Sequence, residues 1–173
     1  MGAEDFESAS VGPDDLLNLQ YTSGTTGAPK GCLLSHEYWL LLARRIWDYA
    51  RLGEDDCALT AQPFYYIDPQ WNTLMCLYGG ISLVVLPRFF ASTFWRSVKE
   101  AGATFFYCLE SMPIFLLKHL PDPEVDRAHC VRLVSCSGIP PQAHAELEAR
   151  WGAPWREGYG TTESGLDLAV PSA

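Results

Sequence analysis

Basic residues are scarce in this sequence. It contains 12 Lys and Arg against 21 Asp and Glu, which gives a formal net charge of −9 at pH 7, and the basic residues form no cluster. A nucleic-acid-binding protein needs Lys and Arg to neutralise phosphates, so we exclude that class. An acidic protein can still bind a nucleotide where a local Lys, backbone N–H groups and Mg²⁺ offset its charge.

Paired cysteine motifs are also missing. No two of the 6 cysteines are spaced as C-x-x-C, and no histidine clusters with them, which argues against a zinc site. Cys108 and Cys136 lie within apolar, strand-like segments, where cysteine usually behaves as a small hydrophobic residue. Free thiols of this kind are typical of the reducing cytosol, so we expect a cytoplasmic protein.

Long apolar runs and a targeting signal are absent from the sequence. The longest apolar runs, 38–43 and 81–87, are far too short to span a membrane. Residues 1–16 are acidic and polar, unlike a secretory signal. The remaining composition is that of an ordinary globular protein, with 48% hydrophobic residues over 173 positions, and it predicts one domain with a core.

Segments of strand and helix character alternate along the chain. After a flexible lead-in over 1–15, we expect two strands joined by a loop within 16–34, and a helix that Ser35 caps and Gly53 ends. Further strands are expected at 57–60, 82–86, 104–109, 131–136 and finally 155–159, with helices at 71–77, 92–102, 111–120 and 141–152. This order predicts an α/β fold with a mostly parallel sheet flanked by helices, and a ligand beyond the carboxyl ends of the strands.

The most informative segment is the glycine- and threonine-rich loop over 21–31, Tyr-Thr-Ser-Gly-Thr-Thr-Gly-Ala-Pro-Lys-Gly. Its glycines permit backbone conformations close to a ligand, while its hydroxyls, N–H groups and Lys30 can surround a polyphosphate. It is not a P-loop, because Gly31 rather than Ser or Thr follows Lys30. A flexible turn between two strands is the plain alternative for such a segment.

A second polar segment spans 157–163, Glu-Gly-Tyr-Gly-Thr-Thr-Glu. Tyr159 offers a flat ring for an aromatic base, Thr162 a donor for a phosphate oxygen, and Glu163 a carboxylate for Mg²⁺. Two further segments, 135–140 and the aromatic 63–71, each follow a predicted strand. The plain alternatives are a surface loop for 157–163, a strand-to-helix turn for 135–140 and aromatic core filling for 63–71.

The loop over 21–31 resembles the phosphate-binding signature of the adenylate-forming, or AMP-binding, superfamily, and 157–163 resembles its second signature, Y-G-x-T-E. This superfamily includes acyl-CoA synthetases, beetle luciferases and the adenylation domains of peptide synthetases. The stretches Phe94-Trp95 and Ala103-Thr104, with their surrounding spacing, are most similar to crotonobetaine/carnitine-type CoA ligases. The resemblance covers about 16–170 and implies a partial large domain, which lacks its N-terminal part and the small C-terminal domain that carries a lysine in this family. We therefore treat 16–173 as part of an adenylation domain.

The resemblance also implies a role for each matching residue. The phosphates of ATP would contact Thr22, Ser23, Gly24, Thr25, Thr26, Gly27, Lys30 and Thr162. The adenine would lie against Ser137, Gly138, Ile139, Glu157, Gly158 and Tyr159. Tyr65 and Tyr66 would line the pocket of the acyl substrate. Glu163 would hold Mg²⁺, and the catalytic residues would be Lys30, Thr162 and Glu163.

The implied reaction converts a small carboxylic acid and ATP into an acyl-adenylate, and then passes the acyl group to CoA, by positioning and charge neutralisation. Three interpretations remain open. The chain is part of an acyl-CoA synthetase with little or no activity alone, a non-catalytic ATP/AMP-binding module, or a structural remnant of the fold, and a partner chain could complete it. An incomplete sheet would leave apolar surface uncovered, so we expect self-association or a complementing chain.

Overall fold

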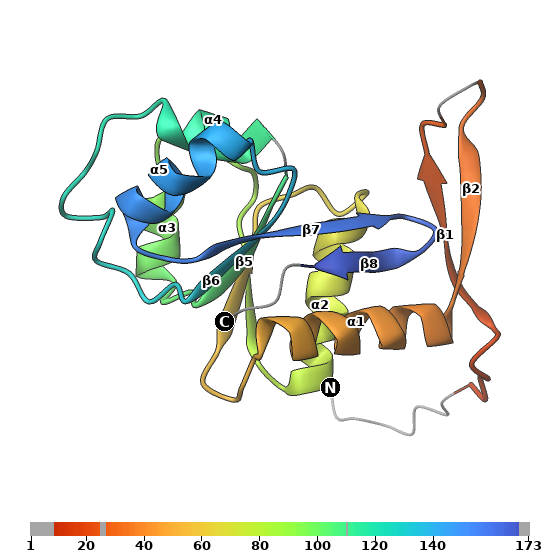
Figure 1. The fold of residues 1–173 in the computed structure, drawn as a ribbon. Coiled ribbons are helices and arrows are strands. Elements are labelled where there is room, and N and C mark those ends of the chain that lie inside the picture. The colour runs from red at the N-terminus through yellow and green to blue at the C-terminus, as the bar shows by residue number, and fades with distance from the viewer. Residues whose placement is uncertain (1–8, 25–26, 110, 170–173) are drawn as a thin grey trace.

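The main body of the protein is a six-stranded sheet between two layers of helices, and a separate hairpin stands beside it (Figure 1). The computed structural model describes residues 9–24, 27–109 and 111–169. The hairpin consists of β1 (Leu16–Thr22) and β2 (Lys30–Ser35), which pair antiparallel. The six strands of the main sheet are β3 (Cys57–Thr60), β4 (Ser82–Val85), β5 (Phe105–Leu109), β6 (Leu133–Ser137), β7 (Trp155–Thr161) and β8 (Gly165–Ala169).

The main sheet has the strand order β4-β3-β5-β6-β7-β8. The pairs from β4 through β7 are parallel, and only β8 runs antiparallel to its neighbour β7. The predicted α/β fold with a mostly parallel sheet is therefore confirmed. The expectation that the strand at 155–159 is the last one was wrong, because β7 continues to Thr161 and a turn over 162–164 leads into β8.

Helices cover both faces of the sheet. One layer contains α1 (His36–Ala50) and α2 (Ile67–Gly79), and the other contains α3 (Phe94–Glu100), α4 (Ser111–Leu117) and α5 (Pro141–Trp151). Phe105 and Phe106 of β5 are both fully buried but belong to opposite apolar clusters, because successive side chains of a strand point to opposite faces. Within the described ranges, no helix is long and apolar enough to cross a membrane.

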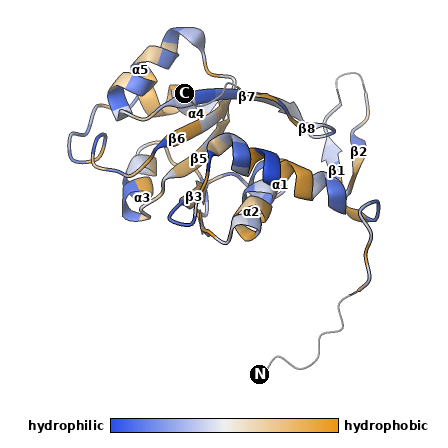
Figure 2. Cartoon of the chain, turned by 60° about the horizontal axis from the view of Figure 1, so that its bottom comes forward, coloured by the Kyte–Doolittle hydropathy of each residue, from blue (hydrophilic) through white to orange (hydrophobic). Residues whose placement is uncertain are grey.

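The first helix shows how the sequence pattern produces this packing. The Ser35 side chain accepts a hydrogen bond from the Tyr38 N–H at 3.2 Å, which confirms the predicted N-cap. Hydrophobic and hydrophilic residues alternate along α1 (Figure 2), and the predicted apolar face is buried. Its buried residues are Trp39, Leu42, Ala43, Ile46 and Ala50.

The predicted end of this helix at Gly53 was wrong. The helix ends at Ala50, and Arg51 takes the left-handed conformation with φ 49° and donates its N–H to carbonyls of the last turn. A long-range contact supports this early end, since the Arg132 guanidinium donates hydrogen bonds of 2.9 Å to the carbonyl oxygens of both Ala50 and Arg51. These bonds satisfy acceptors that a helix C-terminus otherwise leaves open.

Amide side chains hold the hairpin to the helices, together with Leu34 of β2, which is buried in the apolar cluster of α1 and α2. The Gln70 amide donates to Gln20 Oε1 at 3.0 Å, Asn18 donates to Gln70 Oε1 at 3.0 Å, and the Trp39 indole donates to Asn18 Oδ1 at 3.0 Å. These bonds join β1 to α1 and α2. Several large apolar side chains of the hairpin remain exposed, namely Leu16, Leu17, Leu19, Tyr21 and Leu33.

The close contact of α1 with α2 requires a glycine at position 79. A Cβ there would lie 1.8 Å from Cζ3 of Trp47, whereas a Cβ at Gly53 would meet no atom within 4 Å. We expect Gly79→Ala to lower the free energy of unfolding by about 1–3 kcal/mol through overpacking, and Gly53→Ala to cause no loss. Urea denaturation of both variants measures the difference, and equal midpoints would contradict this packing of α1 on α2.

Candidate functional site

One cavity lies where the hairpin, the start of α2 and the carboxyl-end halves of the central strands meet. Its volume is about 550 Å³, which is within the usual range for small-molecule sites. Strands β5, β6 and β7 contribute Tyr107, Ser137 and Tyr159 to its lining. The cavity therefore occupies the place that a parallel sheet predicts for a ligand.

Many of the residues singled out in the sequence meet at this cavity. Those that line it are Thr22, Ser23, Gly24, Lys30, Tyr66, Ser137, Gly158, Tyr159, Thr162 and Glu163. The remaining described ones are not among its lining residues, and they are Gly27, Tyr65, Gly138, Ile139 and Glu157. Tyr65 is 70% exposed, whereas Ile139 is buried in the core. The predicted positions Thr25 and Thr26 lie outside the described residues.

The glycine-threonine segment forms the tip of the β1–β2 hairpin. Thr22 pairs with Lys30 across the hairpin, so both ends of the loop reach the cavity together. Gly24 has φ 66°, and a Cβ there would lie 3.2 Å from the carbonyl oxygen of Ala28. A side chain at this position would therefore be strained, and glycine lets the backbone turn back beside the cavity.

The second signature, residues 157–163, forms the end of β7 and the turn into β8. At Gly160, a Cβ would lie 1.8 Å from the carbonyl oxygen of Gly165, so the two backbones approach more closely than a side chain allows. The Tyr38 hydroxyl of α1 donates to the carbonyl oxygen of Thr162 at 2.9 Å and holds the turn. Tyr159, which is 61% exposed, leaves much of its side chain accessible from the cavity.

The Glu163 carboxylate lies in an environment that keeps it ionised. Its own backbone N–H, the Thr161 side chain and the charge of Lys30 lower the pKa of Glu163 below its usual value. In the described part of the chain, no group of three or more acidic, histidine or cysteine side chains could hold a metal. One exposed carboxylate with nearby hydroxyls fits Mg²⁺ that is bound mainly through phosphates, since Mg²⁺ commonly uses one or two carboxylates together with substrate phosphates.

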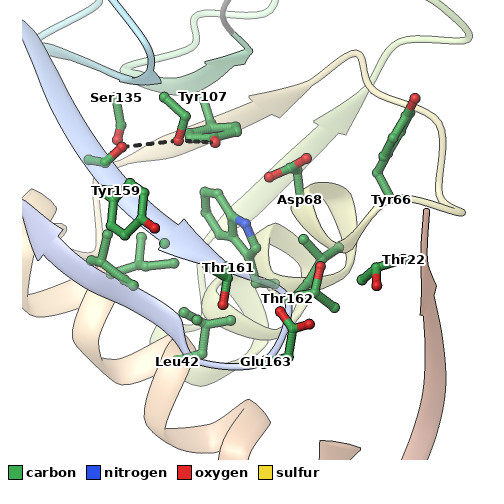
Figure 3. Close-up of a pocket in the computed structure, with 18 of the residues that line it drawn as sticks. Thr22, Leu42, Tyr66, Asp68, Tyr107, Ser135, Tyr159, Thr161, Thr162 and Glu163 are labelled. Carbon is green, nitrogen blue, oxygen red and sulfur yellow. Dashed lines mark hydrogen bonds between the residues drawn. The ribbon is translucent and has the colours of Figure 1, made fainter. Parts of the chain in front are cut away.

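Hydroxyl groups join the three strands beneath the cavity. The Tyr107 hydroxyl donates to Ser137 Oγ at 2.6 Å, and Ser137 Oγ donates to the carbonyl oxygen of Gly158 at 3.0 Å (Figure 3). Burial raises the pKa of Tyr107, so the phenol remains a neutral donor at physiological pH. The two bonds therefore fix the position of Ser137 through its side chain.

Sequence reasoning missed several residues of the cavity wall, among them Asp68, Trp71 and Tyr107. Asp68, at the start of α2, is only 7% exposed, and burial raises its pKa to about 6. Trp71 and Tyr107 line the same region, and their ring centroids are 5.3 Å apart in an edge-to-face arrangement. The sequence did contain a signal for Asp68, because it is an acidic residue within the aromatic segment 63–71 that follows a strand. Only Tyr65 and Tyr66 of that segment were predicted to line the pocket.

Comparison with known proteins agrees with the predicted family. The family model described as AMP-binding enzyme matches residues 2–172. Crotonobetaine/carnitine–CoA ligase from Salmonella arizonae is 34% identical over 156 residues, which are 88% of this chain and 30% of that ligase. The chain thus spans less than a third of the length of this curated relative.

Two solved structures extend the comparison to bound ligands. A malonyl-CoA ligase in a ternary product complex with methylmalonyl-CoA and AMP has a TM-score of 0.87 at 26% identity, over 95% of this chain and 37% of the other. ATP-bound MatB from Rhodopseudomonas palustris has a TM-score of 0.85 at 28% identity, over 97% of this chain and 33% of the other. Because the family model accounts for nearly every residue, and the relatives agree with it in sequence and fold, the chain belongs to the AMP-binding enzyme family.

Proposed function

We propose that the cavity binds ATP beside a carboxylic acid and supports formation of an acyl-adenylate, the first half of an ATP-dependent acid–CoA ligase reaction. One observation carries the proposal. The loop residues Thr22, Gly24 and Lys30 and the distant residues Tyr159 and Glu163 line a single cavity, although they come from opposite ends of the chain. Two family signatures that converge in this way are difficult to explain as independent surface turns.

In this proposal the nucleotide lies along β7 with its phosphates toward the hairpin. The Tyr159 ring stacks on the adenine. The hydroxyls of Thr22 and Thr162 donate to phosphate oxygens, and Lys30 neutralises part of their charge. Thr161, Thr162 and Glu163 lie on one side of the cavity, opposite Tyr107 and Asp68 (Figure 3), which leaves the second side for the acid.

The chemistry requires no protein nucleophile. A carboxylate oxygen of the acid attacks the α-phosphorus of ATP, the bond to the β-phosphate oxygen breaks, and pyrophosphate leaves. The thiol of CoA then attacks the acyl carbon, and AMP leaves with the electron pair of the broken bond. The chain's own groups hold both reactants in place and offset the phosphate charge. Bound Mg²⁺ at Glu163 would supply additional charge neutralisation.

The complete activity belongs to a longer polypeptide or assembly in this proposal, because the chain spans only 30% of the matched ligase. We infer that the chain alone binds nucleotide in the cytoplasm but turns over feebly. The alternative is a nucleotide-binding module that a second chain completes. The exposed apolar residues of the hairpin, such as Leu19 and Leu33, favour a covering partner in either case.

The assigned phosphate and metal residues can be tested by nucleotide binding. We expect Lys30→Ala to weaken the binding of a nonhydrolysable ATP analogue roughly tenfold, because a charge-assisted hydrogen bond contributes about 1.5–3 kcal/mol. Glu163→Ala should weaken it to a similar degree with Mg²⁺ present, and should have no such effect with EDTA. Isothermal titration calorimetry measures these affinities, and Lys118→Ala, in the exposed turn that follows α4, is the matched control.

Unchanged affinity in both Lys30→Ala and Glu163→Ala would overturn the assigned sites. Pyrophosphate release from a panel of carboxylic acids then separates the two functional alternatives. Release above the level of the Lys30→Ala variant supports a ligase, whereas nucleotide binding without release supports the binding module.

The uncovered hairpin predicts self-association of the isolated chain. We expect static light scattering to show a mass above that of a monomer, because large apolar side chains lie together on β1 and β2. The double variant Leu19→Lys and Leu33→Lys should lower that mass. Leu120→Lys, at a site that is 89% exposed and away from the hairpin, is the control. A monomer at high concentration for the unaltered chain would contradict the prediction.

A further inference from the structure

A side chain of α1 reaches the turn that carries Thr162 and Glu163. The Tyr38 hydroxyl donates to the carbonyl oxygen of Thr162 at 2.9 Å, and the bond joins residues 124 positions apart in the chain. The side-chain hydrogen bonds of Thr161 and Ser164 within this turn join only residues three positions apart. Tyr38 is not among the described residues that line the cavity, so it can act on a ligand only through the residues that it holds.

The packing of α1 against the turn leaves this hydroxyl little freedom to move. A Cβ at Gly165 would lie 3.5 Å from the Tyr38 hydroxyl oxygen and 3.1 Å from Cδ1 of Leu42. Because residues four positions apart share one face of a helix, Tyr38 and Leu42 support the turn together. The Tyr38 ring also meets the Trp39 ring edge-to-face, with centroids 5.4 Å apart. The donor is therefore held in place by its own helix.

The acceptor of this bond belongs to the peptide group that joins Thr162 to Glu163. That group is planar and trans, so the Thr162 carbonyl and the Glu163 N–H lie in one rigid unit and point in opposite directions. The Glu163 N–H in turn donates to the carboxylate of its own side chain. Tyr38 thus fixes one end of a peptide group whose other end holds the Glu163 carboxylate. A hydrogen bond to the carbonyl also polarises the group and makes its N–H a stronger donor.

The carboxylate held in this way lies on the phosphate side of the cavity. Figure 3 shows Thr162 and Glu163 beside each other on the side nearest Thr22, and the charge of Lys30 acts on Glu163. Mg²⁺ requires a coordination geometry close to an ideal octahedron, so the direction of a carboxylate ligand matters. A carboxylate that is oriented before the ion arrives loses less side-chain freedom on binding.

We propose that Tyr38 is a positioning residue for nucleotide binding, because its hydroxyl orients the Thr162–Glu163 peptide group and thereby the carboxylate that meets the Mg²⁺ of Mg–ATP. The proposal rests on the proposed function and adds a residue that does not touch the ligand. Part of the affinity that Mg²⁺ adds to nucleotide binding then depends on one oxygen atom of α1.

The test removes the hydroxyl and keeps the ring. A nonhydrolysable ATP analogue is titrated into the chain by calorimetry, once with Mg²⁺ and once with EDTA, and the ratio of the two affinities measures the effect of Mg²⁺. We expect Tyr38→Phe to lower this ratio about threefold or more, as for the loss of one hydrogen bond, and to leave the affinity in EDTA unchanged. Tyr78→Phe, at an exposed tyrosine of α2, is the matched control. Ser35→Ala, which removes the N-cap of α1, should lower the urea midpoint but keep the ratio.

A double variant separates positioning from a general loss of stability. If Tyr38 acts through Glu163, Tyr38→Phe should have no further effect on the ratio in a Glu163→Ala background, because two residues that act as one unit do not lose affinity additively. An additive loss, or an unchanged ratio in Tyr38→Phe alone, would overturn the proposal.

A measurement without nucleotide keeps this proposal distinct from the proposed function. In a ¹⁵N-labelled chain, Tyr38→Phe should shift the amide NMR signal of Glu163, because its peptide group loses a carbonyl hydrogen bond, and Tyr78→Phe should not. If that signal moves but the unaltered chain binds no ATP analogue, the proposed function fails while the link from Tyr38 to Glu163 is supported. An unmoved signal would refute the link, whether or not the nucleotide binds.

Discussion

Burial of the parallel sheet on both faces is the constraint from which the rest of the structure follows. Phe105 and Phe106 point to opposite sides of β5 and are both fully buried, so packed side chains fill both faces of the sheet at these positions. A ligand can instead reach the carboxyl ends of the parallel strands, where backbone groups and loop residues are accessible. Tyr107 and Ser137 mark that edge, and their hydroxyls are joined by a hydrogen bond of 2.6 Å. The cavity is therefore a consequence of the layer arrangement.

The hairpin completes the cavity through polar contacts of a different kind. Asn18, Gln20 and Gln70 form a chain of amide hydrogen bonds, and Trp39 anchors it to the buried face of α1. Hydrogen bonds between amide side chains fix the orientation of the hairpin, because each bond requires its donor and acceptor to meet within a narrow range of angles. They bury little apolar area in doing so. This explains how Thr22 and Lys30 can be held beside the cavity while leucines on the same hairpin remain exposed.

Local signals in the sequence predicted much of the fold. The apolar face of α1 and its Ser35 cap were identified from spacing alone, and the alternation of strands and helices predicted the sheet. Errors occurred where a distant contact decides the outcome. Arg132 lies far along the chain, yet it binds the carbonyl oxygens that end α1 before Gly53. The helix expected at 71–77 begins earlier, at Ile67, because proline is tolerated in the first turn of a helix, where Pro69 lies.

The sequence predicted some residues of the cavity wall but not others. Thr22, Lys30, Tyr159 and Glu163 were identified through two short signatures whose residue order is specific. Asp68 belongs to no such signature, and its place in the cavity wall follows from its burial at the start of α2. The two segments proposed to bind phosphates were therefore recognisable in the sequence, whereas the opposite wall of the cavity emerged only in three dimensions. A binding cavity that recognises a common cofactor and a variable substrate should divide in this way, because only the shared half is constrained to one arrangement.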